Sequence, residues 1–211
     1  MSTARSSHGV AVVDGKLYIT GGKDGTESTL SSVESFDPST GVWSAVAPMS
    51  TARGAHGVAV VDGKIFVMGG YDEQSTDLSS VECFDPSTGV WSAVADMNTA
   101  RYAHGVGVVD GKMYALGGQD NDGSTLSSVE CFDVSTGAWS AVAPMSTARC
   151  YHGVAVVDGK MYTVGGQDED ETTLSSVEFF DPSTGQWNGM AGDMSTARAF
   201  FSVVALECPV E

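Results

Sequence analysis

Residues 49–96 read MSTARGAHGVAVVDGKIFVMGGYDEQSTDLSSVECFDPSTGVWSAVAD. The opening Met-(Ser/Asn)-Thr-Ala-Arg returns at three spacings of 48 residues and a last one of 49, beginning at Met1, Met49, Met97, Met145 and Met194. A fixed period of this length is typical of folds in which one supersecondary unit stacks on its copies. The sequence therefore predicts a single domain over residues 1–211, made of repeats 1–48, 49–96, 97–144 and 145–193 and a partial fifth repeat, 194–211.

Each repeat carries the pattern of four short strands, which we name a to d in chain order. In the first repeat the apolar runs 10–13 and 17–20 flank Asp14-Gly15-Lys16, and Asp-Gly between apolar runs is a strong hairpin signal. Strand c is expected over 32–36 and strand d over 42–46, after the turn 37–41 with its Pro and Gly. A four-stranded meander hides its apolar face only by stacking on its neighbours, which describes a propeller blade.

The fifth repeat begins one more a strand, 201–206, in which Phe201 replaces the His of the other copies and Ser202 the Gly. The predicted fold is all-β, with four four-stranded antiparallel blades plus one extra C-terminal strand. Residues 8–13 and 199–206 then compete for the innermost position of one blade. Three outcomes stay open: a closed four-bladed ring, strand exchange between chains, or a fragment of a larger ring. We favour self-association into a larger ring, since an unclosed stack exposes apolar faces.

A glycine doublet followed by two spaced aromatic residues recurs once per repeat: Gly21-Gly22, Phe36 and Trp43; Gly69-Gly70, Phe84 and Trp91; Gly117-Gly118, Phe132 and Trp139; Gly165-Gly166, Phe180 and Trp187. This pattern resembles the kelch motif over essentially the whole chain. The resemblance implies a kelch-type β-propeller. The first aromatic residue, usually Tyr in the family, is Phe in all four copies, which keeps the packing and drops a hydroxyl.

One arginine and one glutamate also recur in each repeat. They are Arg5, Arg53, Arg101, Arg149 and Arg198, with Glu34, Glu82, Glu130 and Glu178. We expect them to be hydrogen-bond or ion-pair links between blades rather than ligand contacts.

The candidate binding face follows from the order of the strands. In a meander the a–b and c–d turns lie on one face of the ring, and the b–c and d–a loops lie on the other. The first set is nearly uniform, whereas the second differs from repeat to repeat, as expected of loops that carry function on a rigid frame. In kelch proteins that bind peptides, the residue after the glycine doublet and those after the repeated Arg often touch the ligand. The resemblance thus implies binding residues Lys23, Tyr71, Gln119, Gln167, Ser7, Ala55, Tyr102 and Tyr151, with Tyr102 and Tyr151 as aromatic anchors.

The charge of the chain narrows the class of partner. It carries 27 acidic and 10 basic residues, a formal net charge of -17. Nucleic acid and anionic membranes are poor partners, because binding them depends on Lys and Arg. A protein or peptide, preferably basic, suits this surface better. With no membrane segment or signal peptide in the sequence, we expect a cytoplasmic protein without a cofactor.

Enzyme and metal chemistry have little support in the sequence. The histidines His8, His56, His104 and His152 come one per repeat, whereas the copper oxidases of this architecture need an irregular Tyr, Cys and His constellation. The four cysteines show no CxxC spacing, which disfavours a zinc ribbon. We therefore predict no catalytic residue and no metal site, and a non-enzymatic protein- or peptide-binding scaffold. The alternatives are a designed or recently amplified repeat with no native ligand, and a kelch-type metalloenzyme.

Overall fold

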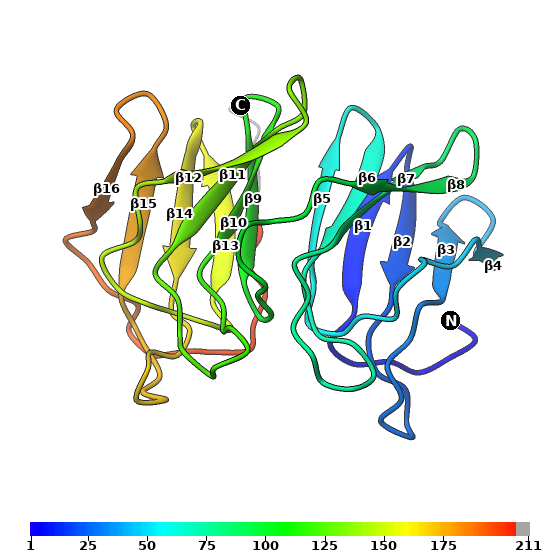
Figure 1. Cartoon of the computed structure of the whole chain (residues 1–211), viewed down its shortest axis with the longest axis horizontal. Helices are drawn as coiled ribbons and strands as arrows, with labels where there is room; N and C mark the ends of the chain where they lie inside the picture. Colours follow the sequence, from blue (N-terminus) through cyan, green and yellow to red (C-terminus); the bar gives the residue numbers. More distant parts are fainter. Residues whose placement is uncertain (206–211) are drawn as a thin grey trace.

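Each of the four complete repeats folds into one four-stranded antiparallel sheet (Figure 1). The computed structural model describes residues 1–205, and within them there is no helix long and apolar enough to cross a membrane. The first two sheets contain β1 Gly9–Val13, β2 Lys16–Thr20, β3 Val33–Asp37, β4 Val42–Val46, β5 Gly57–Val61, β6 Lys64–Met68, β7 Val81–Asp85 and β8 Val90–Val94. The other two contain β9 Gly105–Val109, β10 Lys112–Leu116, β11 Val129–Asp133, β12 Ala138–Val142, β13 Gly153–Val157, β14 Lys160–Val164, β15 Val177–Asp181 and β16 Gln186–Gly189.

The hairpin between the first two strands of each sheet has the tight two-residue turn that its Asp-Gly sequence predicts. In the second blade Val61 pairs with Lys64, and the two residues between them, Asp62 and Gly63, have φ of 50° and 72°. Two central residues with positive φ give the type I′ turn whose twist matches antiparallel strands. The ends of these strands lie within one residue of those predicted from the sequence. The four predicted blades are confirmed as four four-stranded sheets.

The innermost strands β1, β5, β9 and β13 contact one another in succession around a central channel. Glycine begins each of these strands because the next blade presses on it. A Cβ atom on Gly57 would lie 2.3 Å from Val106 Cγ2 and 2.6 Å from His104 Nε2. The blades can approach this closely only where no side chain intervenes.

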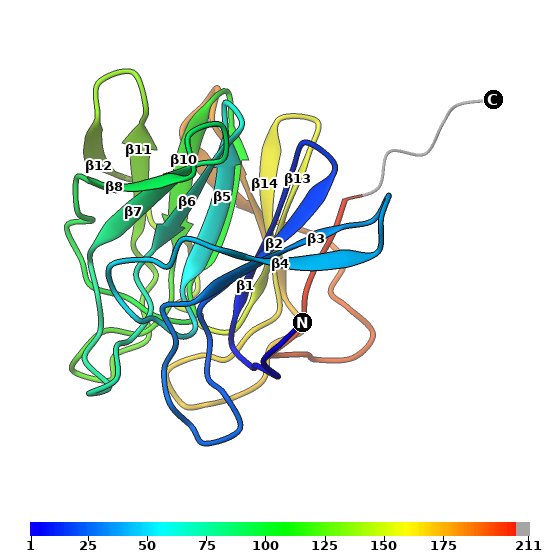
Figure 2. The ribbon, with the colours of Figure 1, turned by 90° about the vertical axis from the view of Figure 1, so that its right-hand side faces the viewer.

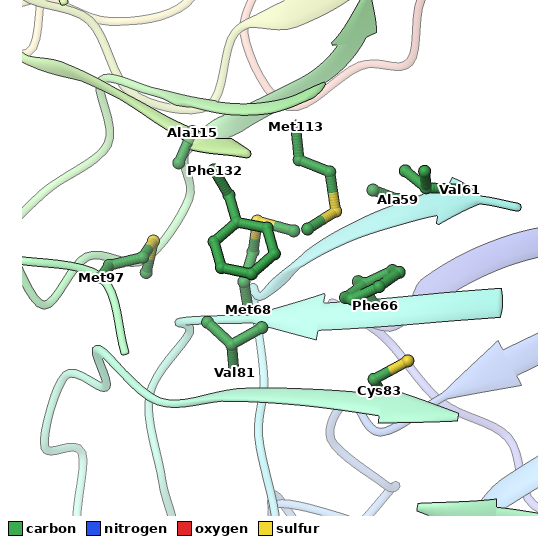
Figure 3. Packing of buried hydrophobic residues seen from close by; sticks show 10 residues of the cluster. All are labelled: Ala59, Val61, Phe66, Met68, Val81, Cys83, Met97, Met113, Ala115 and Phe132. Carbon is green, nitrogen blue, oxygen red and sulfur yellow. The ribbon is translucent and has the colours of Figure 1, made fainter. Parts of the chain in front are cut away.

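Apolar side chains fill the space between adjacent blades. In Figure 3, Phe66, Met68 and Val81 of the second blade face Met113 and Phe132 of the third. The two phenylalanine ring centroids are 6.5 Å apart. Such packing is the main source of stability in a stack of sheets that have no helices to cover them.

Three of the five repeated arginines join one blade to the next, as predicted, whereas within residues 1–205 the side chain of Arg5 bonds only to its own, first blade. The backbone N–H of Arg101 donates to Leu78 O at 3.2 Å, and its carbonyl accepts from Gly70 N at 2.9 Å, both in the second blade. Its fully buried side chain reaches the third blade, where it donates to Gly117 O at 2.7 Å and pairs with Glu130 Oε1 at 2.8 Å. Arg53 and Arg149 repeat this geometry, while the side chain of Arg198 is exposed.

The ring of blades is open. Contacts join the first sheet to the second, the second to the third and the third to the fourth, and in residues 1–205 no comparable set joins the fourth to the first. A closed four-bladed ring is therefore not formed. Residues 199–205, red in Figure 2, continue past β13 in the place of a fifth innermost strand. A Cβ atom on Gly153 would lie 2.2 Å from Val203 Cγ2, and one on Gly105 would lie 2.3 Å from the corresponding Val154 Cγ2.

The predicted strand 201–206 has this position, but residues 201–205 belong to no sheet ladder. Residue 206 lies outside the described residues. Strand exchange and assembly into a larger ring stay predictions. Val12 on β1 is 60% exposed and Trp43 on β4 is 36% exposed, so residues 1–205 leave these apolar side chains on the outer face of the first blade uncovered.

Candidate functional site

Two faces of the ring are built from different loops, as the sequence predicted. On one face, the a–b turn is tied to the c–d turn of the same blade by an exposed ion pair. The Nζ–Oδ2 distance is 3.2 Å between Lys64 and Asp85 and 3.1 Å between Lys112 and Asp133. On the other face, at the bottom of Figure 1, each b–c loop pairs with a d–a loop through an isolated β bridge. The second face, which we call the loop face, carries all eight predicted binding residues.

One aspartate holds each b–c loop in shape. In the second blade, Asp72 Oδ1 accepts from the backbone N–H groups of Gln74 and Thr76, both at 2.9 Å. Asp24, Asp120 and Asp168 make the equivalent bonds in the other blades. Because these loops share one local structure, their sequence differences change side chains on a common backbone frame.

The residue after each glycine doublet lies at the centre of a small three-segment ladder. Tyr71 bridges to Gly54 of the d–a loop and to Asp77 at the far end of its own loop, and Gln119 bridges likewise to Tyr102 and Thr125. Lys23 and Gln167 occupy the same place in the first and fourth blades. The Tyr102 hydroxyl donates to Gln119 Oε1 at 2.5 Å, so two predicted binding residues also contact each other through their side chains.

The mouth of the channel is framed by the second residue after each repeated arginine. These residues are Ser7, Ala55, Ala103, Tyr151 and Phe200, and their φ angles lie between 48° and 57°. Each of the last four donates its N–H to the carbonyl of the one before, at 2.9 to 3.0 Å. Such φ values are uncommon for residues other than glycine. The backbone hydrogen bonds that link one copy to the next hold these residues at positive φ. Their side chains line a hollow of about 510 Å3.

Four aromatic side chains, Tyr71, Tyr102, Tyr151 and Phe200, form a continuous row across the loop face. Successive ring centroids are 5.7, 6.3 and 4.0 Å apart. Lys23 extends this aromatic row at one end, since its Nζ lies 5.0 Å from the centroid of Tyr71. Burial raises the pKa of both Tyr102 and Tyr151, so their hydroxyls stay protonated at neutral pH and remain hydrogen-bond donors.

Ala103, Phe200, Ser75 and Asp77 also lie on this face and were not among the residues predicted. Ala103 and Phe200 occupy the same position in their repeats as Ser7, Ala55 and Tyr151, so aligning all five copies would have found them. Asp77 stands where the other repeats have Thr29, Thr125 and Thr173. This difference from the other repeats is the feature of the sequence that could have identified it.

The four histidines line the channel rather than a metal site. Burial lowers the pKa of His56 and of His152 to about 3, so both are neutral at physiological pH. The rings of His56, His104 and His152 each pack on the glycine that starts the innermost strand of the preceding blade. His56 Nε2 also hydrogen-bonds Thr20 Oγ1 at 2.8 Å. In residues 1–205 no three His, Cys, Asp or Glu side chains gather closely enough to hold a metal ion.

Comparison with known proteins identifies relatives of this fold. The family model for the Attractin/LZTR1 β-propeller matches residues 1–205. Beta-scruin of Limulus polyphemus is 36% identical over 47 residues, which span 22% of this chain and only 5% of that protein. The solved structure of YjhT superposes with a TM-score of 0.83 at 18% identity, over 95% of this chain and 74% of that one. The last likeness shows the fold alone.

Proposed function

Because the chain belongs to the Attractin/LZTR1 β-propeller family, of the kelch type whose members generally act in protein interactions, we propose that its loop face binds a protein or peptide. The observation that carries the proposal is the aromatic row. Tyr71, Tyr102, Tyr151 and Phe200 interrupt an otherwise repeated sequence, and all four lie on one face. Exposed, rigid aromatic side chains are the usual anchors of protein interfaces.

The charge of the loop face favours a basic partner. The four b–c loops, 23–29, 71–77, 119–125 and 167–173, contain eleven acidic residues and one lysine, Lys23. On the opposite face, a lysine pairs with an aspartate in every blade. A positively charged segment would be drawn to the loop face, and its association should be faster at low ionic strength.

The proposal assigns no catalytic role to the chain. Burial lowers the pKa of all four histidines, so they are neutral at physiological pH, and three of the four are buried. The free thiols Cys83, Cys131 and Cys150 are buried, and burial raises the pKa of each, which suppresses the reactive thiolate.

Replacing Tyr102 and Tyr151 together with alanine should reduce binding by at least about a hundredfold, since each anchor is worth about 2 kcal/mol or more. Neither residue belongs to the repeated framework, so the melting temperature should change little. The ligand would be a peptide selected on the purified chain from a random display library, and the affinity would be measured by calorimetry.

The matched control replaces Lys64 and Lys112 with alanine on the opposite face, where we expect affinity within about twofold of the parent. If the peptide kept its affinity for the double tyrosine variant and lost it for the double lysine variant, the opposite face would be the binding surface. Failure of the library to yield any specific ligand would count against the proposal as a whole.

A further inference from the structure

A second, smaller hollow opens on the loop face. It has a volume of about 280 Å3 and is lined by Lys23, Tyr71, Ser75, Asp77 and Tyr102. Tyr71, Ser75 and Asp77 come from one b–c loop, and Tyr102 from the d–a loop of the next blade. The hollow therefore joins side chains from loops whose backbones the framework already fixes.

Three of the lining residues depart from the repeat. Where this blade has Tyr71, the others have Lys23, Gln119 and Gln167; where it has Asp77, the others have threonine. Where the third repeat has Tyr102, the other copies have Ser6, Gly54, Cys150 and Ala199. The other blades fold with different residues at these positions, so the fold does not require Tyr71, Asp77 or Tyr102. Their meeting in one hollow points to a ligand rather than to packing.

Asp77 supplies a negative charge that no cation neutralises in residues 1–205. Its backbone N–H donates to Asn121 Oδ1 at 2.9 Å, which fixes it against the loop of the third blade. Its carboxylate makes no ion pair within the described chain. Partial burial, together with the nearby Asp120 and Asp72, raises its pKa to about 6. A cation that entered the hollow would relieve this unfavourable environment.

The tyrosine rings give the hollow aromatic walls. The rings of Tyr71 and Tyr102 meet edge to face, at 76°. Tyr71 already accepts one cation, since Lys23 Nζ lies 5.0 Å from its centroid while pairing with Glu27 at 3.6 Å. A guanidinium group is planar, stacks on aromatic rings and donates two parallel hydrogen bonds to a carboxylate, which an ammonium group does not.

We propose that the hollow formed by Tyr71, Ser75, Asp77 and Tyr102 receives the guanidinium group of an arginine in the partner peptide. The proposal rests on the proposed function of the loop face and names one side chain that this face recognises. The arginine stacks against the tyrosines and pairs with Asp77.

The test is an NMR titration of the isotopically labelled full chain with Nα-acetyl-arginine methylamide. Amide shifts should move at Tyr71, Ser75, Asp77 and Tyr102 and saturate at millimolar concentration. The citrulline analogue has the same shape but no charge, and we expect it to bind about tenfold more weakly or not at all. Equal binding of the two compounds, or shifts spread over all the acidic loops, would overturn the proposal.

Two variants distinguish a specific site at Asp77 from a general attraction of the acidic loops for a positive charge. Asp77→Thr introduces the residue that the other three repeats have at this position, so folding should be preserved. The substitution should lower the affinity for the arginine probe about tenfold. Asp122→Asn removes the same charge from an exposed position of the neighbouring loop and should leave affinity unchanged within about twofold. Equal losses in both variants would mean that the attraction comes from net charge alone.

Binding of the probe should also fall as the pH is lowered through about 6, because Asp77 loses its charge there. The charged and titratable groups that surround it are Asp72, Asp120, Lys23, Tyr71 and Tyr102. Burial raises the pKa of Tyr102, so its hydroxyl stays protonated between pH 5 and 7. Affinity that was constant across this interval would contradict the role of Asp77.

Failure of this proposal can be told apart from failure of the proposed function. A selected peptide that needs Tyr102 and Tyr151 but is indifferent to Asp77→Thr would overturn the arginine site and leave the loop face as the binding surface. An arginine probe that binds at Asp77, on a chain for which no peptide ligand is found, would support the site and count against the wider function.

Discussion

Replacing Arg101 with methionine should lower the free energy of unfolding by about 3–5 kcal/mol, as measured by urea denaturation. The substitution leaves the carboxylate of Glu130 buried without its partner and removes the bonds from the guanidinium to Gly117 O and Ser128 O. The loss should be large because the backbone of Arg101 is held by the second blade and its side chain by the third. One residue thus joins two sheets.

The matched control is Lys112→Met in the same blade. Lys112 Nζ lies 3.1 Å from Asp133 Oδ2, a distance close to the 2.8 Å of the arginine pair, but its side chain is 46% exposed. Solvent screens this pair, so its loss should lower the free energy of unfolding far less than the loss of the Arg101 pair. Similar losses in the two variants would show that burial between blades does not decide the strength of these ion pairs.

Trp91→Ala should cost about 3–5 kcal/mol of unfolding free energy, seen as a clear drop in the thermal midpoint. The indole Nε1–H donates to Ala47 O of the first blade at 2.8 Å, and the ring packs 5.0 Å from that of Phe84 in its own blade. The substitution removes this bridge between sheets and leaves a cavity between the first and second blades, where Trp91 packs against the cluster that contains Ala11, Val13 and Ile65.

Trp43→Ala provides the comparison for Trp91. Trp43 stacks on Phe36 at the same 5.0 Å, but it belongs to the first blade, where no preceding blade in this chain covers it, and it is 36% exposed. Its removal should cost distinctly less than that of Trp91. An unchanged midpoint for Trp91→Ala, or equal effects at both positions, would count against tryptophan as a link between blades.

The strands and blades could be predicted from the sequence because the evidence for them is local and repeated. Asp14-Gly15 marks a two-residue hairpin wherever it stands between apolar runs, and four copies of each turn reinforce one another. The third strand was expected at 32–36 and lies at 33–37, since Asp37 still pairs with Val42 across the sheet. The two faces followed from the order of the strands alone.

The details of the site depend on distances between repeats, which no local pattern contains. The sequence marked Tyr71, Tyr102 and Tyr151 as variable positions, but not that they would form one row with Phe200. Asp77 was missed because its partial burial and its nearness to Asp120 of the next blade depend on how the loops pack together. The open ring was likewise undecided, because only the packing of one sheet against another determines whether the blades meet.

The most direct test of the loop face as the binding surface is hydrogen–deuterium exchange on the full chain, with and without a peptide selected from a random library. Protection is expected in the b–c loops, 23–29, 71–77, 119–125 and 167–173, and in the d–a residues beside them, 54–55, 102–103 and 150–151. The opposite turns, such as 62–64 and 85–89, should exchange at the same rate in both samples. Protection confined to those turns, with the aromatic row unaffected, would contradict the account.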